Sequence, residues 1–284
     1  MKIHLILASI VFVLVLVAAG AGVFYTTPGA PFEFTTVRGE VAMAQGSGLY
    51  RYDPVVLVRE GVIWDAINLF VGLPLFALAI FLAWRGSLRG RLLLAGLLFY
   101  WFYTYLMLMT MYALNALFLV YVAVYALSAV AFFINLNTID VARLPGQLSA
   151  KFPRRGFIGY AFVVAALLIF LWTSRLVPIL LSGVFPPELA GMVTLETQGF
   201  DLGMVVPLMI CTGVLLWRRS AWGTLLAAVA ISYGGLMSIV LPAWIAVPLL
   251  RDGTTNWVEA APFSIVCILG LGFAWAFFKN VSAS

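Results

Sequence analysis

Two carboxylates and two carboxamides lie at matching places in the sequence, each pair at the edge of a long apolar run. Asp65 is followed by Asn68, and Gln198 by Asp201, so each pair holds one acid and one amide three residues apart. Residues at this spacing share a face of an α-helix. Acids in membrane segments usually pair with another group or line a path. The four side chains therefore form a candidate binding site for a small solute, an ion or a lipid.

The same residues also have a purely structural interpretation. If helices begin at these positions, Asp and Asn cap free N–H groups and favour the positive end of the helix dipole, which stabilises a helix by about 0.5–2 kcal/mol per cap. Arg175 is the candidate counter-charge, because it falls at the outer end of its apolar segment. It either extends its charged group to the interface or forms a salt bridge with Asp201 or Asp65.

Tyr100 and Tyr233 complete the candidate site, because both fall near the middle of apolar segments. A tyrosine hydroxyl in that position needs a hydrogen-bond partner. The two rings either pack between helices or line a cavity for a ligand or lipid. An aspartyl dyad of Asp65 and Asp201 is disfavoured, because the two acids do not occupy equivalent positions.

Several chemistries are excluded by the residues present. His4 is the only histidine, so haem, copper or zinc sites with two histidines and catalytic triads with a histidine base are ruled out. Cys211 and Cys267 lie in separate apolar segments and fit as small packing residues. No phosphate-binding glycine loop or dinucleotide motif is present. We expect no cofactor and no metal, and enzymatic activity is the less favoured interpretation.

The composition identifies the solvent that surrounds these residues. The chain has 284 residues, of which 64% are hydrophobic and 10% charged, and its mean hydropathy is +1.10. One water-soluble core cannot bury so much apolar surface, so the lipid bilayer is the expected environment. The sequence predicts an all-α polytopic bundle with eight apolar segments. The length of each is close to or above the roughly 20 residues that a helix needs to cross a bilayer. These segments are residues 4–24, 61–84, 92–113, 116–136, 156–173, 201–217, 221–249 and 261–278.

The charged residues predict the orientation, because short cytoplasmic loops retain lysine and arginine. If the N-terminus is cytoplasmic, most basic residues and a single acid, Asp140, fall on the inner side. The formal net charge of +5 therefore describes a basic inner rim and an acidic outer rim, with no indication of nucleic-acid binding. We expect the protein in the inner (cytoplasmic) membrane, with both termini in the cytoplasm.

The segments between the spans divide the chain further. Residues 1–25 form either the first transmembrane helix or a cleaved signal peptide, since a basic start and small residues accompany the apolar run. Residues 26–60 form an outer segment with the pattern of a short β-hairpin. Residues 61–137 hold helices two to four, residues 138–155 a basic inner loop, and residues 156–284 helices five to eight.

A parallel internal repeat is also predicted. Residues 68–100 align without a gap onto residues 201–233, so that Asn68 meets Asp201 and Tyr100 meets Tyr233. Pro74 meets Pro207 as well, and both prolines should bend their helices. Since both segments run from outside to inside, the repeat relates four helices to four by an axis along the membrane normal. This symmetry would bring Asp65, Asn68, Gln198 and Asp201 together below the outer surface.

The stretch DLGMVVPLMICTGVLLWRRSAWG resembles segments of prokaryotic multipass membrane proteins that carry an acid, a proline and a Trp-Arg-Arg turn in this order. That resemblance implies no activity. A small permease or channel predicts a hydrated path from the outer face toward Tyr100 and Tyr233. An accessory or scaffold subunit of a membrane complex, with other membrane proteins as partners, predicts a filled centre. A lipid-handling protein predicts a lateral opening beside the outer acids.

Overall fold

The computed structural model describes residues 2–185, 189, 191–252 and 257–282, and this part of the chain is predominantly helical. It contains eight helical segments long and apolar enough to cross a membrane. The prediction of an all-α bundle with eight spans is confirmed, and the chain is a multipass membrane protein. Its helices are α1 (Ile3–Phe24), α2 (Val55–Ile67), α3 (Leu73–Trp84), α4 (Leu88–Met111), α5 (Phe118–Leu136), α6 (Leu144–Gln147), α7 (Arg154–Ser182), α8 (Glu196–Phe200), α9 (Val206–Trp217), α10 (Ala221–Asp252) and α11 (Trp257–Asn280).

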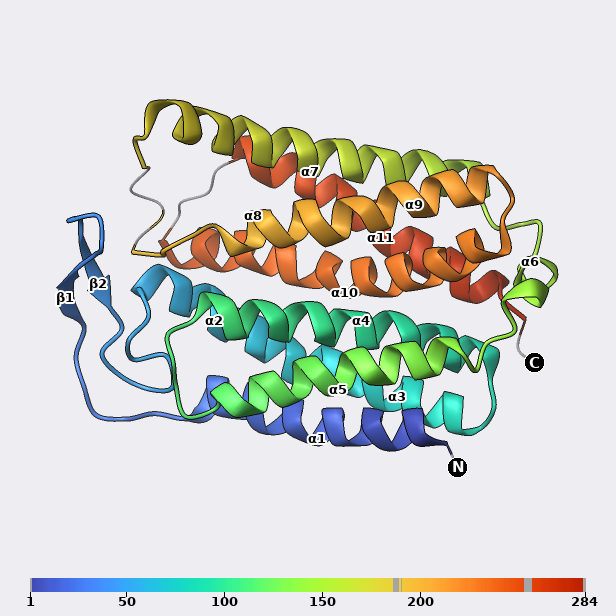
Figure 1. Ribbon diagram of the computed structural model, residues 1–284, viewed down its shortest axis with the longest axis horizontal. Helices are drawn as coiled ribbons and strands as arrows, with labels where there is room; N and C mark the ends of the chain where they lie inside the picture. The colour runs from blue at the N-terminus through green and yellow to red at the C-terminus, as the bar shows by residue number, and fades with distance from the viewer. Residues whose placement is uncertain (1, 186–188, 190, 253–256, 283–284) are drawn as a thin grey trace.

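The long helices form two groups that lie side by side (Figure 1). The first group contains α1, α2 with α3, α4 and α5, and the second contains α7, α8 with α9, α10 and α11. Helix α4 of the first group packs along α10 of the second. Gly96 makes this approach possible, because a Cβ atom at its position would overlap the side chain of Ser232.

Two helices begin earlier than the sequence predicts. The second span begins at Val55 instead of residue 61, and the sixth at Glu196 instead of residue 201. The earlier start of α2 is explained by burial, because Leu57 and Val58 of its first turn are buried. Asp65, Asn68 and Asp201 therefore lie inside continuous helices, where N–H groups are already bonded. The capping interpretation is wrong for these three residues.

Each of these two spans contains a π-helical turn, at Asn68–Gly72 and at Asp201–Val205. The N–H of Leu73 donates to the carbonyl of Asn68, and the N–H of Val206 donates to that of Asp201. A proline follows directly in both helices, and because proline lacks an N–H and its ring crowds the carbonyl four residues back, a local widening relieves the clash. The alignment of residues 68–100 with 201–233 places one π turn on the other.

The turns after these helices also correspond. Gly86 has φ 83° and Arg219, its aligned residue, has φ 57°, so both turns pass through the left-handed region. In the next helix, Gly90 and Gly223 each lie against the backbone of the preceding helix at aligned residues. The two helical hairpins thus share local geometry. The duplication of the whole chain, with four helices in each repeat, stays a prediction.

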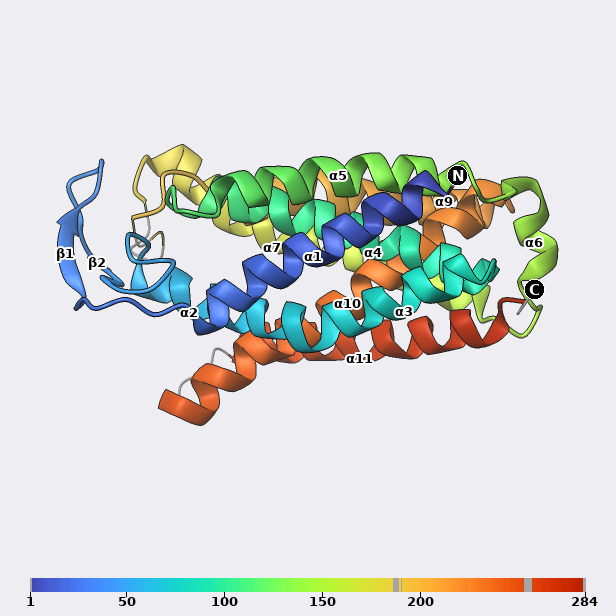
Figure 2. The same cartoon turned by 90° about the horizontal axis from the view of Figure 1, so that it is seen from below.

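The two ends of the bundle differ in character. Both termini and α6 lie at one end, and strands β1 (Phe32–Thr35) and β2 (Val41–Ala44) lie at the other (Figures 1 and 2). The strands pair antiparallel, with Phe32 opposite Ala44, which confirms the predicted hairpin. The Lys2 side chain donates to the carbonyl of Trp84, and Arg219 lines a pocket with Arg154 and Arg155, so basic residues gather at the end with the termini. That this end faces the cytoplasm stays a prediction.

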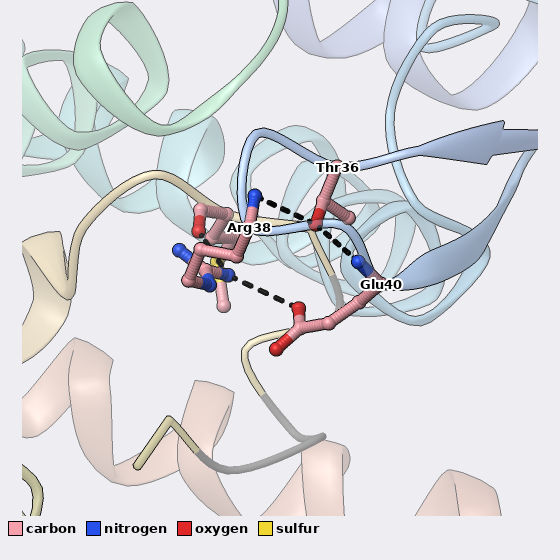
Figure 3. Close-up of polar contacts among 4 residues, drawn as sticks. Thr36, Arg38 and Glu40 are labelled. Carbon is pink, nitrogen blue, oxygen red and sulfur yellow. Dashed lines mark hydrogen bonds and ion pairs between the residues drawn. The ribbon is translucent and has the colours of Figure 1, made fainter. Parts of the chain in front are cut away.

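The turn of the β-hairpin docks on the connection between α7 and α8 (Figure 3). Thr36 Oγ1 accepts the backbone N–H groups of Arg38 and Glu40 and so shapes the turn. The Arg38 guanidinium lies 3.5 Å from the Glu40 carboxylate and donates to the Met192 carbonyl at 3.0 Å. It also lies over the ring of Phe185, 5.1 Å from its centroid. The outer segment of the first group therefore fixes a loop of the second.

Candidate functional site

Asp65 lies inside the first group of helices, next to α1. Its carboxylate accepts a hydrogen bond from the hydroxyl of Tyr50 at 2.5 Å, and the residue is 1% exposed. Gly22 of α1 touches it directly, because a Cβ at Gly22 would overlap the carboxylate. Asp65 thus joins α2 to α1 and to the outer segment.

Asn68 and Tyr100 form a second buried contact in the same group. The Tyr100 hydroxyl donates to Asn68 Oδ1 at 2.7 Å and accepts from the indole N–H of Trp64 at 2.8 Å. Asn68 and Tyr100 are fully buried. These hydrogen bonds satisfy the Tyr100 hydroxyl within the protein. Of the two alternatives stated for Tyr100, the ring therefore packs between helices and does not line the cavity.

Asp201 has different surroundings. Its Oδ1 accepts from the Tyr103 hydroxyl at 2.6 Å, and its Oδ2 accepts from the Trp172 indole N–H at 3.0 Å. Tyr103 in turn packs against Tyr233, with ring centroids 5.3 Å apart, and Tyr233 lies 6.3 Å from Tyr100. The predicted residues are therefore connected through tyrosine rings without forming a single cluster.

Asp201 and Tyr233 line a cavity of about 240 Å³, whereas Asp65, Asn68 and Tyr100 do not. The cavity lies among α7, α9, α10 and α11 and reaches Tyr103 of α4. Its walls are mainly apolar and aromatic, and Asp201 is the one carboxylate among the described side chains that line it. A concave apolar space with few polar groups is the usual form of a small-molecule site.

The cavity results from two small residues on α10. Trp101 and Tyr105 of α4 fill the interior of the first group and are fully buried. If the same offset of 133 residues is continued past residues 100 and 233, the corresponding residues in the second group are Gly234 and Ser238, which line the cavity. A Cβ placed at Gly234 meets no heavy atom within 4 Å. Neither position was predicted from the sequence; the available signal is the difference between large and small residues just beyond the aligned stretch.

A second pocket, of about 740 Å³, lies toward the hairpin end and is called the vestibule here. Arg175 and Gln198 line it, together with Glu60 and Glu196. The guanidinium of Arg175 lies over the ring of Trp172, 5.4 Å from its centroid, so the indole of Trp172 contacts both Arg175 and Asp201. Four side chains line both the vestibule and the cavity: Trp64, Trp172, Thr197 and Trp244.

Asp53 lies outside the membrane spans and ties the outer segment to the connection between α4 and α5. Its Oδ1 accepts the backbone N–H of Ala113 at 2.6 Å, whereas its Oδ2 has no hydrogen-bond partner. Burial raises the pKa of this carboxyl from its ordinary value to about 7, although the hydrogen bond from Ala113 lowers it. The protonation of Asp53 therefore changes near neutral pH.

Within the described residues, no group of three or more His, Cys, Asp or Glu side chains is arranged to hold a metal ion. Cys211 and Cys267 are both free thiols. No family model, curated protein or solved structure matches this chain.

Proposed function

We propose that the protein is a small permease that admits a solute from the hairpin end through the vestibule into the cavity beside Asp201. The observation that carries this proposal is the shared boundary of the two spaces, at Trp64, Trp172, Thr197 and Trp244. In this proposal the protein lies in the cytoplasmic membrane, and the hairpin faces outward, as the distribution of basic residues predicts.

The packing of the two groups argues against a function as a scaffold alone. A scaffold needs only filled interiors and external contact faces. The first group meets this description, since Trp101 and Tyr105 fill it, but the second leaves its centre open beside Gly234. Solute binding requires an open centre with some polar groups. A function that depends on packing alone does not explain why the second group has one.

The helix that carries Asp201 also has features suited to movement. Its π turn begins at Asp201, and π turns in α-helices are frequent at functional sites. Pro207 follows within the same helix, and proline weakens the local backbone ladder. In the proposed permease, this turn is the hinge at which the helix bends to pass the solute toward the other end.

A lipid-handling function is the second candidate, on one observation. In the first group the backbones of α1 and α5 run close together, whereas those of the corresponding helices α7 and α11 come close at few positions and meet mainly through side chains such as Tyr160 and Phe273. The cavity lies beside this contact and its walls are mainly apolar. A lateral entry between α7 and α11 would suit a lipid chain.

Cysteine accessibility separates these functions. A Gly234→Cys variant, in a background with Cys211→Ala and Cys267→Ala, is treated in intact cells with a membrane-impermeant methanethiosulfonate. The permease proposal expects modification from the aqueous phase, because it requires a path from the vestibule into the cavity past the side chains that line both. The matched control is Thr104→Cys, a fully buried position on α4 that lines neither space.

The outcomes divide the functions clearly. Modification at residue 234 without modification at residue 104 supports an aqueous path. Protection at both positions contradicts the permease. If residue 234 instead reacts only with a membrane-soluble maleimide, access from the lipid is indicated and the second candidate is favoured.

A further inference from the structure

We infer that the cavity binds an organic cation with an apolar body, and that Asp201 is its counter-ion. This inference rests on the proposed function and specifies the class of solute. It is carried by the carboxylate's partners, by the aromatic walls around it and by the polar groups at the opposite end of the cavity.

Asp201 forms no ion pair within the part of the chain that the structure describes. Both of its hydrogen-bond donors, the Tyr103 hydroxyl and the Trp172 indole, are neutral groups. Because each oxygen already accepts a donor, the arrangement suits the ionised carboxylate. An ionised acid at this depth is costly without a cation, and a cationic ligand would supply one.

The walls next to Asp201 suit a positive charge. Tyr103, Trp172 and Tyr233 surround the carboxylate end of the cavity, and Trp64 and Trp244 stand at the boundary with the vestibule. Aromatic faces attract ammonium groups through their quadrupoles. An ammonium group beside Asp201 would therefore gain from both the carboxylate and the rings.

The vestibule favours the same sign of charge. Of the described side chains that line it, two are carboxylates, Glu60 and Glu196, and one is a guanidinium, that of Arg175. The guanidinium is held over Trp172. A cation entering from the hairpin end would meet more negative than positive groups before it reaches Asp201.

The far end of the cavity suits an apolar group. Ser238 donates its hydroxyl to the carbonyl of Gly234 at 2.6 Å, and Tyr160 donates to the carbonyl of Val266 at 3.2 Å. These polar groups are satisfied within the protein, and the surrounding walls include Met209 and Phe263. A ligand with its charge at one end and hydrocarbon at the other matches this distribution.

Two isosteric probes test the inference. Benzyltrimethylammonium carries a fixed positive charge, and neopentylbenzene has the same shape with a carbon atom in place of the nitrogen. Binding of each to the full chain in phosphatidylcholine nanodiscs is measured by quenching of tryptophan fluorescence, since Trp172 and Trp64 line the space. We expect the wild type to bind the cation more tightly than the neutral probe by a factor of roughly ten or more.

Asp201→Asn should remove this preference and leave the affinity for the neutral probe unchanged. The variant is expected to fold, because the aligned residue is Asn68, whose amide oxygen accepts from a tyrosine in the same way. The control is Glu33→Gln on the exposed hairpin, which removes one negative charge away from the cavity and the vestibule and should leave both affinities unaltered.

The inference is overturned if the neutral probe binds the wild type as tightly as the cation, if Asp201→Asn keeps the preference, or if neither probe binds. In each of these cases the permease proposal still stands on the modification of Gly234→Cys. Protection of that cysteine from the aqueous reagent overturns the permease, even if the cation binds from the lipid.

Discussion

Residues 101 and 234 occupy aligned positions in the two groups of helices, and changes of side-chain size there should have opposite effects on stability. Gly234→Leu places a side chain where a Cβ finds no neighbour within 4 Å. Trp101→Ala removes a fully buried ring from a filled interior. We expect the first variant to be more stable than the wild type and the second to be less stable.

The structure bounds both magnitudes. A buried void costs ~24 cal/mol per Å³, so complete filling of the 240 Å³ cavity would stabilise the protein by at most ~6 kcal/mol. Replacing a glycine inside a helix contributes ~1 kcal/mol on its own, which sets the lower bound for Gly234→Leu. Loss of a buried tryptophan costs ~3–5 kcal/mol, and we expect Trp101→Ala to fall in this range.

Thermal unfolding in one detergent, followed by circular dichroism, measures both effects. A change of 1 kcal/mol shifts Tm by roughly 2–4 °C in a chain of this size class. Gly235→Leu is the matched control, because a Cβ at Gly235 already lies 3.5 Å from Ala274 and a larger side chain there has less room. Equal losses of Tm for the leucine variants at residues 234 and 235 would refute the assignment of an open space beside α10.

Three further predictions concern the first group and the outer segment. The folded state keeps Asp53 protonated up to about pH 7, so between about pH 4 and pH 7 it binds more protons than the unfolded state. The stability of the wild type should therefore fall as the pH rises through this range. Asp53→Asn should remove this fall, seen as a smaller change of Tm with pH. Gly22→Ala should destabilise the protein by ~1–3 kcal/mol, seen as a lower Tm, since the methyl group overlaps the Asp65 carboxylate. Arg38→Ala removes the bond to the Met192 carbonyl and should speed proteolysis of the loop between α7 and α8, with little change in Tm.

The fold was largely predictable because its signal is local. A span is a run of apolar residues with the length of a bilayer, and the eight runs are visible without any knowledge of their neighbours. The helix starts were less accurate, since the apolar turn at Leu57 and Val58 reads equally well as part of the outer segment. Burial of that turn depends on contacts that the local pattern does not contain.

The candidate site was harder to predict, because helical spacing says which residues share a face and not what fills the space opposite. Asp65 and Asn68 do share a face, but Tyr50 and Tyr100 occupy the space in front of them. The prediction relied on polar residues, which are present in both groups. The cavity depends instead on missing volume at Gly234 and Ser238. Identical residues mark the local backbone geometry that the two helical hairpins share, whereas the cavity is marked by a difference in side-chain size.

This asymmetry also bears on how a permease of this kind would work. Movement needs one part that keeps its shape and one that changes, because packed interiors resist gradual deformation. The first group has the filled interior, with Trp101 at its centre, and α4 presents that rigid surface to α10. The second group has the open centre and carries Asp201 at the start of a π turn. Bending at this turn would move the carboxylate relative to Tyr103 and Trp172, so release of the ligand and rupture of these two hydrogen bonds would be one event.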